Sequence, residues 1–175
     1  MYKSKPSGYS YTYSELIIKA GQAVGVSPYH IASRIKQEVG SSLSSVTNGK
    51  HAKYPGIYNF YNIGGYDSAS GNAVTNALRW AATSGSYGRP WNNDYKSIYG
   101  GAQYIGNNYI LKKQNTLYTQ KFNVTNTSNL FSHQYMSNVQ GDLSGSGYRS
   151  MAVYRGGGDL NRGCVLRYDQ GIFLC

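Results

Sequence analysis

Two amphipathic helical patterns follow each other directly at the start of the chain, and the fold must bury one face of each. The first opens with Thr12 and Glu15 at the spacing of a capping box and closes at Gly25. The second opens with a Ser-Pro pair, a cap followed by proline in the first turn, and closes at Gly40. Apolar residues recur at the helical period in both: Leu16, Ile17, Ala20, Val24, Ile31, Ile35 and Val39. The pair predicts a mainly helical fold.

The rest of the pattern predicts more helices around one irregular region. Helical spacing returns at 73–83, then from Asp94 or Ser97 to 109, at 116–122 and around 133–139. We expect Asp94 to have a capping role. Residues 41–71 are rich in Ser, Gly, Asn and Tyr, and Tyr54-Pro55-Gly56 marks a turn, so this stretch is predicted to be an irregular or hairpin lobe.

The length of 175 residues fits about one domain. Residues 1–140 carry the periodic patterns and are predicted to form it, whereas 141–175 are interpreted as a linker or a poorly patterned tail. Both cysteines, Cys164 and Cys175, lie in that tail, so they cannot cross-link the domain, and whether they pair with each other stays open.

The charge of the chain restricts the classes of molecule that it is expected to bind. Seventeen Lys and Arg face seven Asp and Glu, a net charge of +10, and the basic residues are scattered. Such a field favours a polyanionic partner: nucleic acid, anionic lipid or the polymers of a bacterial wall. The 19 tyrosines offer flat rings that stack on sugars or bases. No apolar run approaches the roughly 20 residues of a membrane span, and we expect no membrane insertion.

Two of the seven carboxylates, Asp67 and Glu38, remain as candidates after each is assessed, and the sequence is most informative about Glu38. Glu38 follows Ile31 by seven positions and Ile35 by three, so it falls on the apolar stripe in the last turn of its helix. Burial there raises the pKa of a carboxyl group, the condition that a general acid needs. The alternative is a surface salt bridge to Arg34, one turn earlier. Spacing alone leaves both interpretations open.

Residues 59–67 combine aromatic rings, amides, glycines and Asp67 without a helical signature, which suits contact with a polar ligand as well as an ordinary turn. The three histidines show no metal-ligand spacing, and no phosphate-binding loop is present in the sequence. We therefore expect neither a metal nor another cofactor.

Several ordered motifs resemble the endo-β-N-acetylglucosaminidases of glycoside hydrolase family 73, which include bacterial autolysins. They are 27–38 (SPYHIASRIKQE), 58–64 (YNFYNIG), 78–81 (LRWA), 87–92 (YGRPWN), 100–106 (GGAQYIG), 115–118 (NTLY) and 133–136 (HQYM). The resemblance implies a lysozyme-like α+β fold, with a helical lobe and a small β-rich or irregular lobe flanking a cleft. It also implies hydrolysis of the β-1,4 bond on the reducing side of N-acetylglucosamine in peptidoglycan.

Carried over by position, the resemblance makes Glu38 the general acid and places Tyr135 in the cleft. The family often has an aspartate where this sequence has Asn138, so the role of that position is not carried over unchanged. Asp67 is the remaining candidate for a second catalytic group. The candidate substrate-binding residues are Phe60, Tyr61, Asn62, Tyr66, Trp91 and Asn138.

The second catalytic group has two possible identities. In the first, the substrate's own 2-acetamido group attacks the anomeric carbon, and Asp67, Asn62 or Tyr135 orients it. In the second, Asp67 is the base of an inverting reaction, with the two carboxyl groups about 6.5 to 9.5 Å apart.

Peptidoglycan strands are thus the expected partner, with other anionic wall polymers as further candidates. We expect an extracellular or cell-wall location, reached through a signal outside this sequence or by the route of a phage lysis enzyme. The rival interpretations are a muramidase or lytic transglycosylase on the same fold and a wall-binding module without turnover. Nucleic acid is not expected as a partner, because the basic residues form no stripe and no recognition motif.

Overall fold

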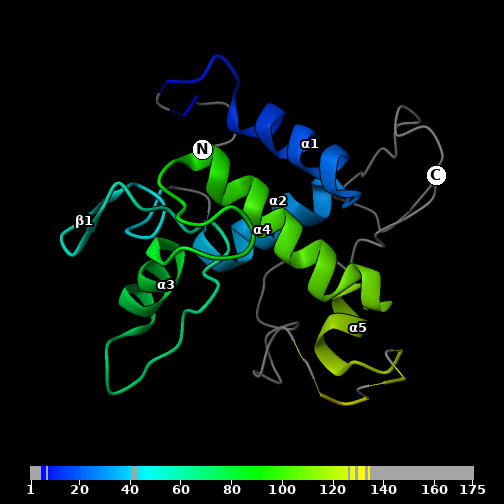
Figure 1. Ribbon diagram of the computed structural model, residues 1–175. Coiled ribbons are helices and arrows are strands. Elements are labelled where there is room, and N and C mark those ends of the chain that lie inside the picture. Colours follow the sequence, from blue (N-terminus) through cyan, green and yellow to red (C-terminus); the bar gives the residue numbers. More distant parts are fainter. Residues whose placement is uncertain are drawn as a thin grey trace.

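A computed structural model describes residues 5–6, 8–40, 43–125, 127–128, 130–132 and 134. Its elements are the helices α1 (Tyr13–Val24), α2 (Pro28–Val39), α3 (Ala73–Ala82), α4 (Asp94–Asn108) and α5 (Leu117–Phe122), the 3-10 helix η1 (Ile110–Lys112) and the strands β1 (Lys50–His51) and β2 (Tyr54–Pro55). In Figure 1, α4 crosses in front of α2, the hairpin and α3 lie on one side, and α5 lies on the other. The prediction of a mainly helical fold is confirmed.

The boundaries of α1 and α2 follow from their capping residues. The amide of Thr12 donates to Glu15 Oε2 at 2.7 Å, the amide of Glu15 donates to Thr12 Oγ1 at 3.3 Å, and Gly25 ends α1 with a φ of 67°. In α2, Pro28 occupies the first turn, but the Ser27 side chain makes no capping hydrogen bond. The predicted capping box is confirmed, whereas the predicted side-chain cap at Ser27 is wrong.

The apolar stripes of α1 and α2 meet α4 in one core. Helix α1 packs against both other helices, and the core also takes in two rings from the irregular region. Its buried members include Leu16, Ile17, Ala20, Ile31, Ile35, Phe60, Tyr61, Ile98, Ala102 and Ile105. Burial of this apolar area is the main favourable term in the folding of the domain.

Asp94 ties α4 to α1 and does not cap α4. The side chain of Asn93 caps the helix by accepting from the amide of Lys96 at 2.8 Å, and the Asp94 carboxylate accepts from the Tyr13 hydroxyl at 2.5 Å. Burial raises the pKa of Asp94, and the Tyr13 hydrogen bond lowers it by a smaller amount. The predicted capping role of Asp94 is therefore wrong by one residue.

The irregular lobe contains one very short hairpin. Lys50 and His51 pair in antiparallel register with Pro55 and Tyr54, and the amide of Gly56 donates to the Gly49 carbonyl at 2.8 Å. Tyr54 and Pro55 form the strand β2, and the chain turns directly after them, because the amide of Ile57 donates to the Tyr54 carbonyl at 3.3 Å and Gly56 has a φ of 72°. The mostly irregular lobe with a hairpin and the turn at Tyr54-Pro55-Gly56 both agree with the prediction.

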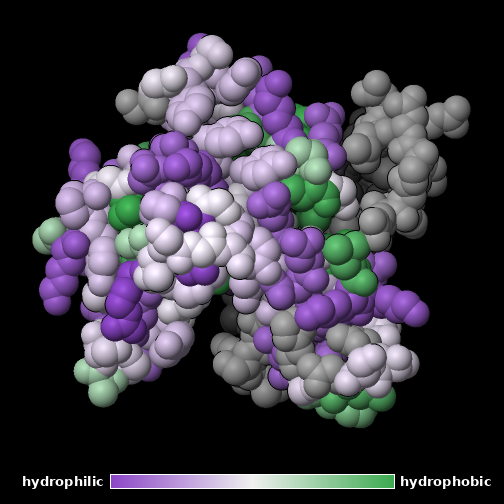
Figure 2. Space-filling model, in the orientation of Figure 1, coloured by the Kyte–Doolittle hydropathy of each residue, from purple (hydrophilic) through white to green (hydrophobic). Residues whose placement is uncertain are grey.

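Among the described helices, none is both long and apolar enough to cross a lipid bilayer. Figure 2 shows hydrophilic residues over most of the visible face, with apolar patches that are small and separate. The predicted helix at 133–139, the boundary near residue 140 and the tail with its two cysteines lie outside the described residues.

Candidate active site

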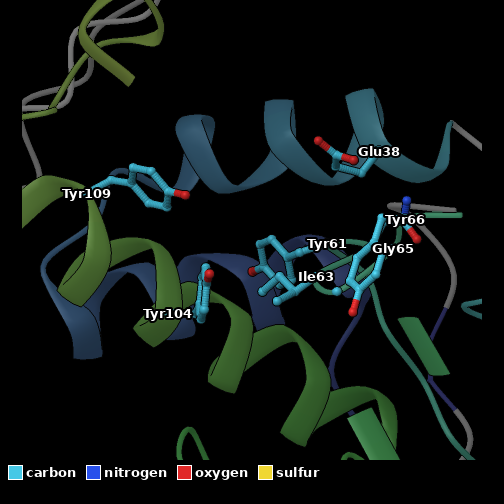
Figure 3. Close-up of a pocket in the computed structure, with 9 residues that line it drawn as sticks. Glu38, Tyr61, Ile63, Gly65, Tyr66, Tyr104 and Tyr109 are labelled. Atoms are coloured by element: carbon cyan, nitrogen blue, oxygen red, sulfur yellow. The ribbon is translucent and has the colours of Figure 1, made fainter. Parts of the chain in front are cut away.

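A pocket of about 220 Å³ lies between the end of α2 and the irregular lobe. Figure 3 shows Glu38 on α2 along one wall, with Tyr61, Ile63, Gly65 and Tyr66 from the facing segment. Tyr104 from α4 and Tyr109 at the end of that helix complete the lining. The pocket thus gathers one carboxyl group, aromatic rings and the residue Asn62 from parts of the chain that are far apart in sequence.

Glu38 has the environment of a carboxyl group that holds its proton. It is half-buried in the last turn of α2, and this burial raises its pKa above the ordinary value for glutamic acid. The positive charge of Arg34 lowers the pKa, but by less than burial raises it. The group therefore stays protonated to a higher pH than an exposed glutamic acid and remains open to the pocket.

Arg34 is a buried residue and not half of a surface salt bridge. Only 1% of it is exposed, and its guanidinium donates to Gln37 Oε1 at 3.0 Å and to Gln120 Oε1. Gln120 also donates to the Gln114 carbonyl at 2.9 Å and lies 3.3 Å from His30 Nε2. These contacts connect α2 with α5 and hold in place the positive charge that acts on Glu38.

Tyr61 forms the base of the pocket. It is almost fully buried, and its hydroxyl donates to the Ile98 carbonyl of α4 at 2.8 Å. The ring lies so close to α4 that a Cβ atom on Gly101 would come within 2.0 Å of Tyr61 Cδ2. The absence of a side chain at Gly101 therefore sets the depth of the pocket.

Asn59 shapes the segment that faces Glu38. Its buried amide nitrogen donates to the carbonyls of Ile63 and Ala77, both at 2.9 Å, and its oxygen accepts from the Ile63 amide at 3.2 Å. Asn62, which lines the pocket, adopts a φ of 50°, in the left-handed region that asparagine tolerates. The sequence pattern gave no sign that Asn59 is a structural residue while its neighbours line the pocket.

Two of the predicted substrate-binding residues belong to the interior. Phe60 and Trp91 are both 0% exposed. The Phe60 ring packs against Tyr13, with centroids 5.7 Å apart, and Trp91 packs edge-on against Trp80 at 5.1 Å. Neither side chain reaches the pocket, so the prediction that they contact a ligand is wrong, because their rings fill the core beneath the lobe.

The other candidates fall into three groups. Tyr61, Asn62 and Tyr66 line the pocket together with Glu38. Asp67 is exposed, does not line the pocket, and accepts at 2.8 Å from the Ala73 amide at the start of α3. Tyr135 and Asn138 lie outside the described residues.

Tyr104 and Tyr109 are pocket residues that the sequence analysis did not select. Burial raises the pKa of both hydroxyl groups, so both remain protonated donors at neutral pH. Tyr109 is the last residue of the helix predicted from Asp94 or Ser97, and Tyr104 lies within one of the family motifs. The motif was the only available signal, because the helical period cannot tell a ring in a core from a ring in a pocket.

Comparison with known proteins identifies relatives, although no family model matches the chain. It is 30% identical over 129 residues to the bifunctional autolysin of Staphylococcus epidermidis, and 28% identical over 132 residues to that of Staphylococcus aureus. Each match covers 69% of this chain. The chain is a homologue of these autolysins. It spans about a tenth of their length, since the matches cover 9% and 10% of the two relatives.

Solved structures agree with this homology. Autolysin E of Staphylococcus aureus, in complex with a muropeptide, superposes on this autolysin homologue with a TM-score of 0.54 at 26% identity, over 73% of this chain and 52% of the other. Glucosaminidase B of the same species gives 0.50 at 26% identity, over 72% and 46%. A catalytic mutant of autolysin E, in complex with the disaccharide NAG-NAM, gives 0.52 at 24% identity, over 73% and 52%, and supports the fold.

The predicted family resemblance and the lysozyme-like fold are therefore confirmed for the autolysin homologue. The roles of its individual side chains follow from geometry and stay proposals.

Proposed function

We propose that the chain hydrolyses the β-1,4 bond between N-acetylglucosamine and N-acetylmuramic acid in peptidoglycan, with Glu38 as the general acid. The observation that carries the proposal is a half-buried carboxyl group, its pKa raised by burial, on the wall of a pocket lined by rings and amides. Homology to autolysins, and the NAG-NAM disaccharide held by a mutant of one relative, support this choice of substrate.

Glu38 supplies the proton that breaking a glycosidic bond requires. The leaving oxygen is a poor leaving group until it is protonated, and a general acid with a raised pKa still carries its proton near neutral pH. Burial shifts the pKa of Glu38 in this direction, and Arg34 favours the carboxylate that forms when the proton leaves. A group in this setting can donate a proton and later recover one.

The pocket's other side chains suit a pyranose with an acetamido group. Tyr66 is 62% exposed and presents a ring face at the rim, where it can stack on a sugar. The Asn62 side chain can hydrogen-bond an amide. The hydroxyl groups of Tyr104 and Tyr109 also line the pocket, and the Tyr109 hydroxyl donates to that of Tyr104, which leaves the Tyr104 hydroxyl as a further donor.

Two mechanisms are possible: attack by the substrate's own 2-acetamido group, and direct attack by water with Asp67 as the base. The first, substrate-assisted route has the better support. Among the described residues, Glu38 is the one carboxyl group that lines the pocket, and Asp67 is occupied at the start of α3. The 2-acetamido oxygen attacks the anomeric carbon while the bond to the leaving oxygen breaks and Glu38 protonates that oxygen. Water then adds to the anomeric carbon of the oxazolinium ion and gives its proton to the Glu38 carboxylate. Asn62 is the proposed residue that orients the acetamido group.

The stereochemistry of the product tests this route. Attack by the acetamido group followed by water retains the β configuration, whereas direct attack by water inverts it. Proton NMR of a soluble glycan fragment during the first minutes of reaction should show the β anomer of the new reducing end. Initial release of the α anomer would contradict the route and restore the need for a second carboxylate.

Mass spectrometry of digested walls tests the function. Purified peptidoglycan treated with the protein should yield fragments that end in reducing N-acetylglucosamine. Fragments that end in reducing or anhydro N-acetylmuramic acid would instead identify a muramidase or a lytic transglycosylase. Binding to walls without release of any fragment would identify a binding module.

The proposed place of action is the bacterial wall. The net charge of +10 favours association with anionic wall polymers, and this attraction should weaken with added salt.

A further inference from the structure

A second hollow, of about 250 Å³, adjoins the pocket of Glu38. The two share Gly64 and Tyr66, so Tyr66 stands between them. The second hollow is lined by Gly64, Tyr66, Asn76, Arg79, Trp80, Thr83 and Arg89. This lining contains two guanidinium groups and no carboxylate among the described residues, so the hollow carries positive charge.

Arg89 is held in a fixed position in this lining. Its Nε donates to the Ser86 carbonyl at 3.1 Å, its Nη1 donates to the Trp80 carbonyl at 3.0 Å, and its guanidinium lies 4.0 Å from the centroid of the Trp80 ring. A Cβ atom on Gly85 would lie 2.5 Å from Arg89 Nη2, so the side chain fits because residue 85 is glycine. The backbone carbonyls orient this cation without neutralising it.

Arg79 supplies the second cation from the exposed face of α3. Its Nη2 donates to Ser70 Oγ at 3.0 Å, a neutral partner that leaves the charge in place. A guanidinium group presents paired N–H donors that match the two oxygens of a carboxylate. The half-buried Trp80 ring, against which Arg89 stacks, also lines the hollow and offers an apolar surface.

Asn76 fixes the boundary between the two hollows. Its buried side-chain nitrogen donates to the Tyr66 carbonyl at 2.6 Å, to Ser68 Oγ at 2.9 Å and to the Gly71 carbonyl at 2.8 Å. These bonds hold the segment that carries Tyr66 against α3. A ligand bound beside Glu38 and extending past Tyr66 therefore enters the positively charged hollow.

We propose that this hollow is a subsite for a carboxylate group of the substrate, bound by Arg79 and Arg89. This proposal rests on the proposed function, because the subsite would distinguish between substrates that all contain N-acetylglucosamine units. Peptidoglycan offers two sources of a carboxylate: the stem peptide and, where the peptide is absent, the lactyl group of N-acetylmuramic acid. Chitin fragments offer neither. The subsite thus makes the protein selective for acidic glycan strands.

Three ligands distinguish these sources: a disaccharide peptide, the bare NAG-NAM disaccharide and neutral chitobiose. Binding is measured at low salt in a Glu38→Gln background, which prevents turnover, by the change in tryptophan fluorescence. Of the two tryptophans, Trp91 is fully buried, so a ligand in the hollow acts on Trp80. We expect about tenfold tighter binding of one or both acidic ligands than of chitobiose, as charge-assisted hydrogen bonds predict.

Arg79→Gln should abolish this preference without changing the binding of chitobiose. Lys112→Gln is the matched control, because it removes the same charge from an exposed residue that lines neither hollow. Arg89→Lys keeps the charge but loses the planar pair of donors, and should weaken the preference with the protein still folded. Thermal melting of each variant verifies that it is folded.

The outcomes separate the subsite from the proposed function. Preference for the disaccharide peptide alone assigns the stem carboxylate, and preference for the bare disaccharide assigns the lactyl carboxylate. Equal binding of all three ligands, or a preference that survives Arg79→Gln, overturns the subsite even if walls are cleaved as proposed. Conversely, if the parent protein cleaves no wall, the proposed function fails, and the fluorescence titration still decides the subsite.

Discussion

At the scale of the residue, the burial of Glu38, the proposed general acid, also has a cost in stability. Burial that keeps the side chain protonated also disfavours the charged form in the folded protein. Its folded pKa lies above its unfolded pKa, so the unfolded chain loses this proton first as pH rises. The contribution of Glu38 to the free energy of unfolding is therefore greatest at low pH and declines as pH rises through the raised pKa.

The Glu38→Gln variant should show the opposite trend relative to the parent. Because the amide carries no charge to desolvate, the variant's melting temperature relative to that of the parent should increase between pH 4 and pH 7. Thermal denaturation monitored by circular dichroism at a series of pH values measures this difference. A difference that stays constant or decreases with pH would contradict the assignment of a raised pKa.

Glu15→Gln serves as a control, because its effect on stability should change with pH in the opposite direction. Hydrogen bonds from the backbone and side chain of Thr12 lower the pKa of Glu15, so its contribution to stability is present at neutral pH and is lost as pH falls. This variant should lose stability relative to the parent at pH 7 and approach it at low pH.

At the scale of the element, α4 sets the position of the base of the pocket, because Gly101 has no side chain to displace the Tyr61 ring. Glycines at 101 and 106 lie in the same helix, where replacing glycine by alanine gains about 1 kcal/mol of helix propensity. Their surroundings differ. A Cβ atom at Gly101 would overlap the Tyr61 ring, whereas at Gly106 the nearest atom is Val26 Cγ2 at 3.3 Å.

Gly101→Ala should therefore destabilise the protein and displace Tyr61 from the base of the pocket. Overpacking of a core costs about 1 to 3 kcal/mol, which exceeds the propensity gain. Gly106→Ala should be near neutral or slightly stabilising, because its neighbour has only a few tenths of an ångström to move. Urea denaturation of both variants measures the difference, and equal stability of the two would contradict the close packing of Tyr61 on α4.

At the scale of the whole molecule, the sequence predicted what local rules determine. The capping box at Thr12 and the apolar period of α1 and α2 depend on residues within one or two turns of each other, so the helices and the place of Glu38 could be found. The family motifs added the lysozyme-like fold and the kind of substrate.

Contacts between distant parts of the chain could not be predicted in this way. Asp94 accepts a hydrogen bond from Tyr13 instead of capping α4. Tyr13 is 81 positions away, so a local pattern cannot reveal this partner. Phe60 and Tyr66 are both aromatic residues of one irregular segment, yet one is fully buried and the other 62% exposed. The bond from the Phe60 amide to Ser97 Oγ, at 3.1 Å, contributes to that difference, and no periodicity encodes it.

The rate of wall hydrolysis by the Glu38→Gln variant is the most direct test of the central claim, that Glu38 is the proton donor. Release of new reducing ends from purified peptidoglycan is measured for the parent and for a variant shown to be folded by its melting curve. Loss of a general acid predicts a rate lower by about 10² to 10⁴. A variant that hydrolyses walls within about twofold of the parent, far inside that range, would contradict the assignment.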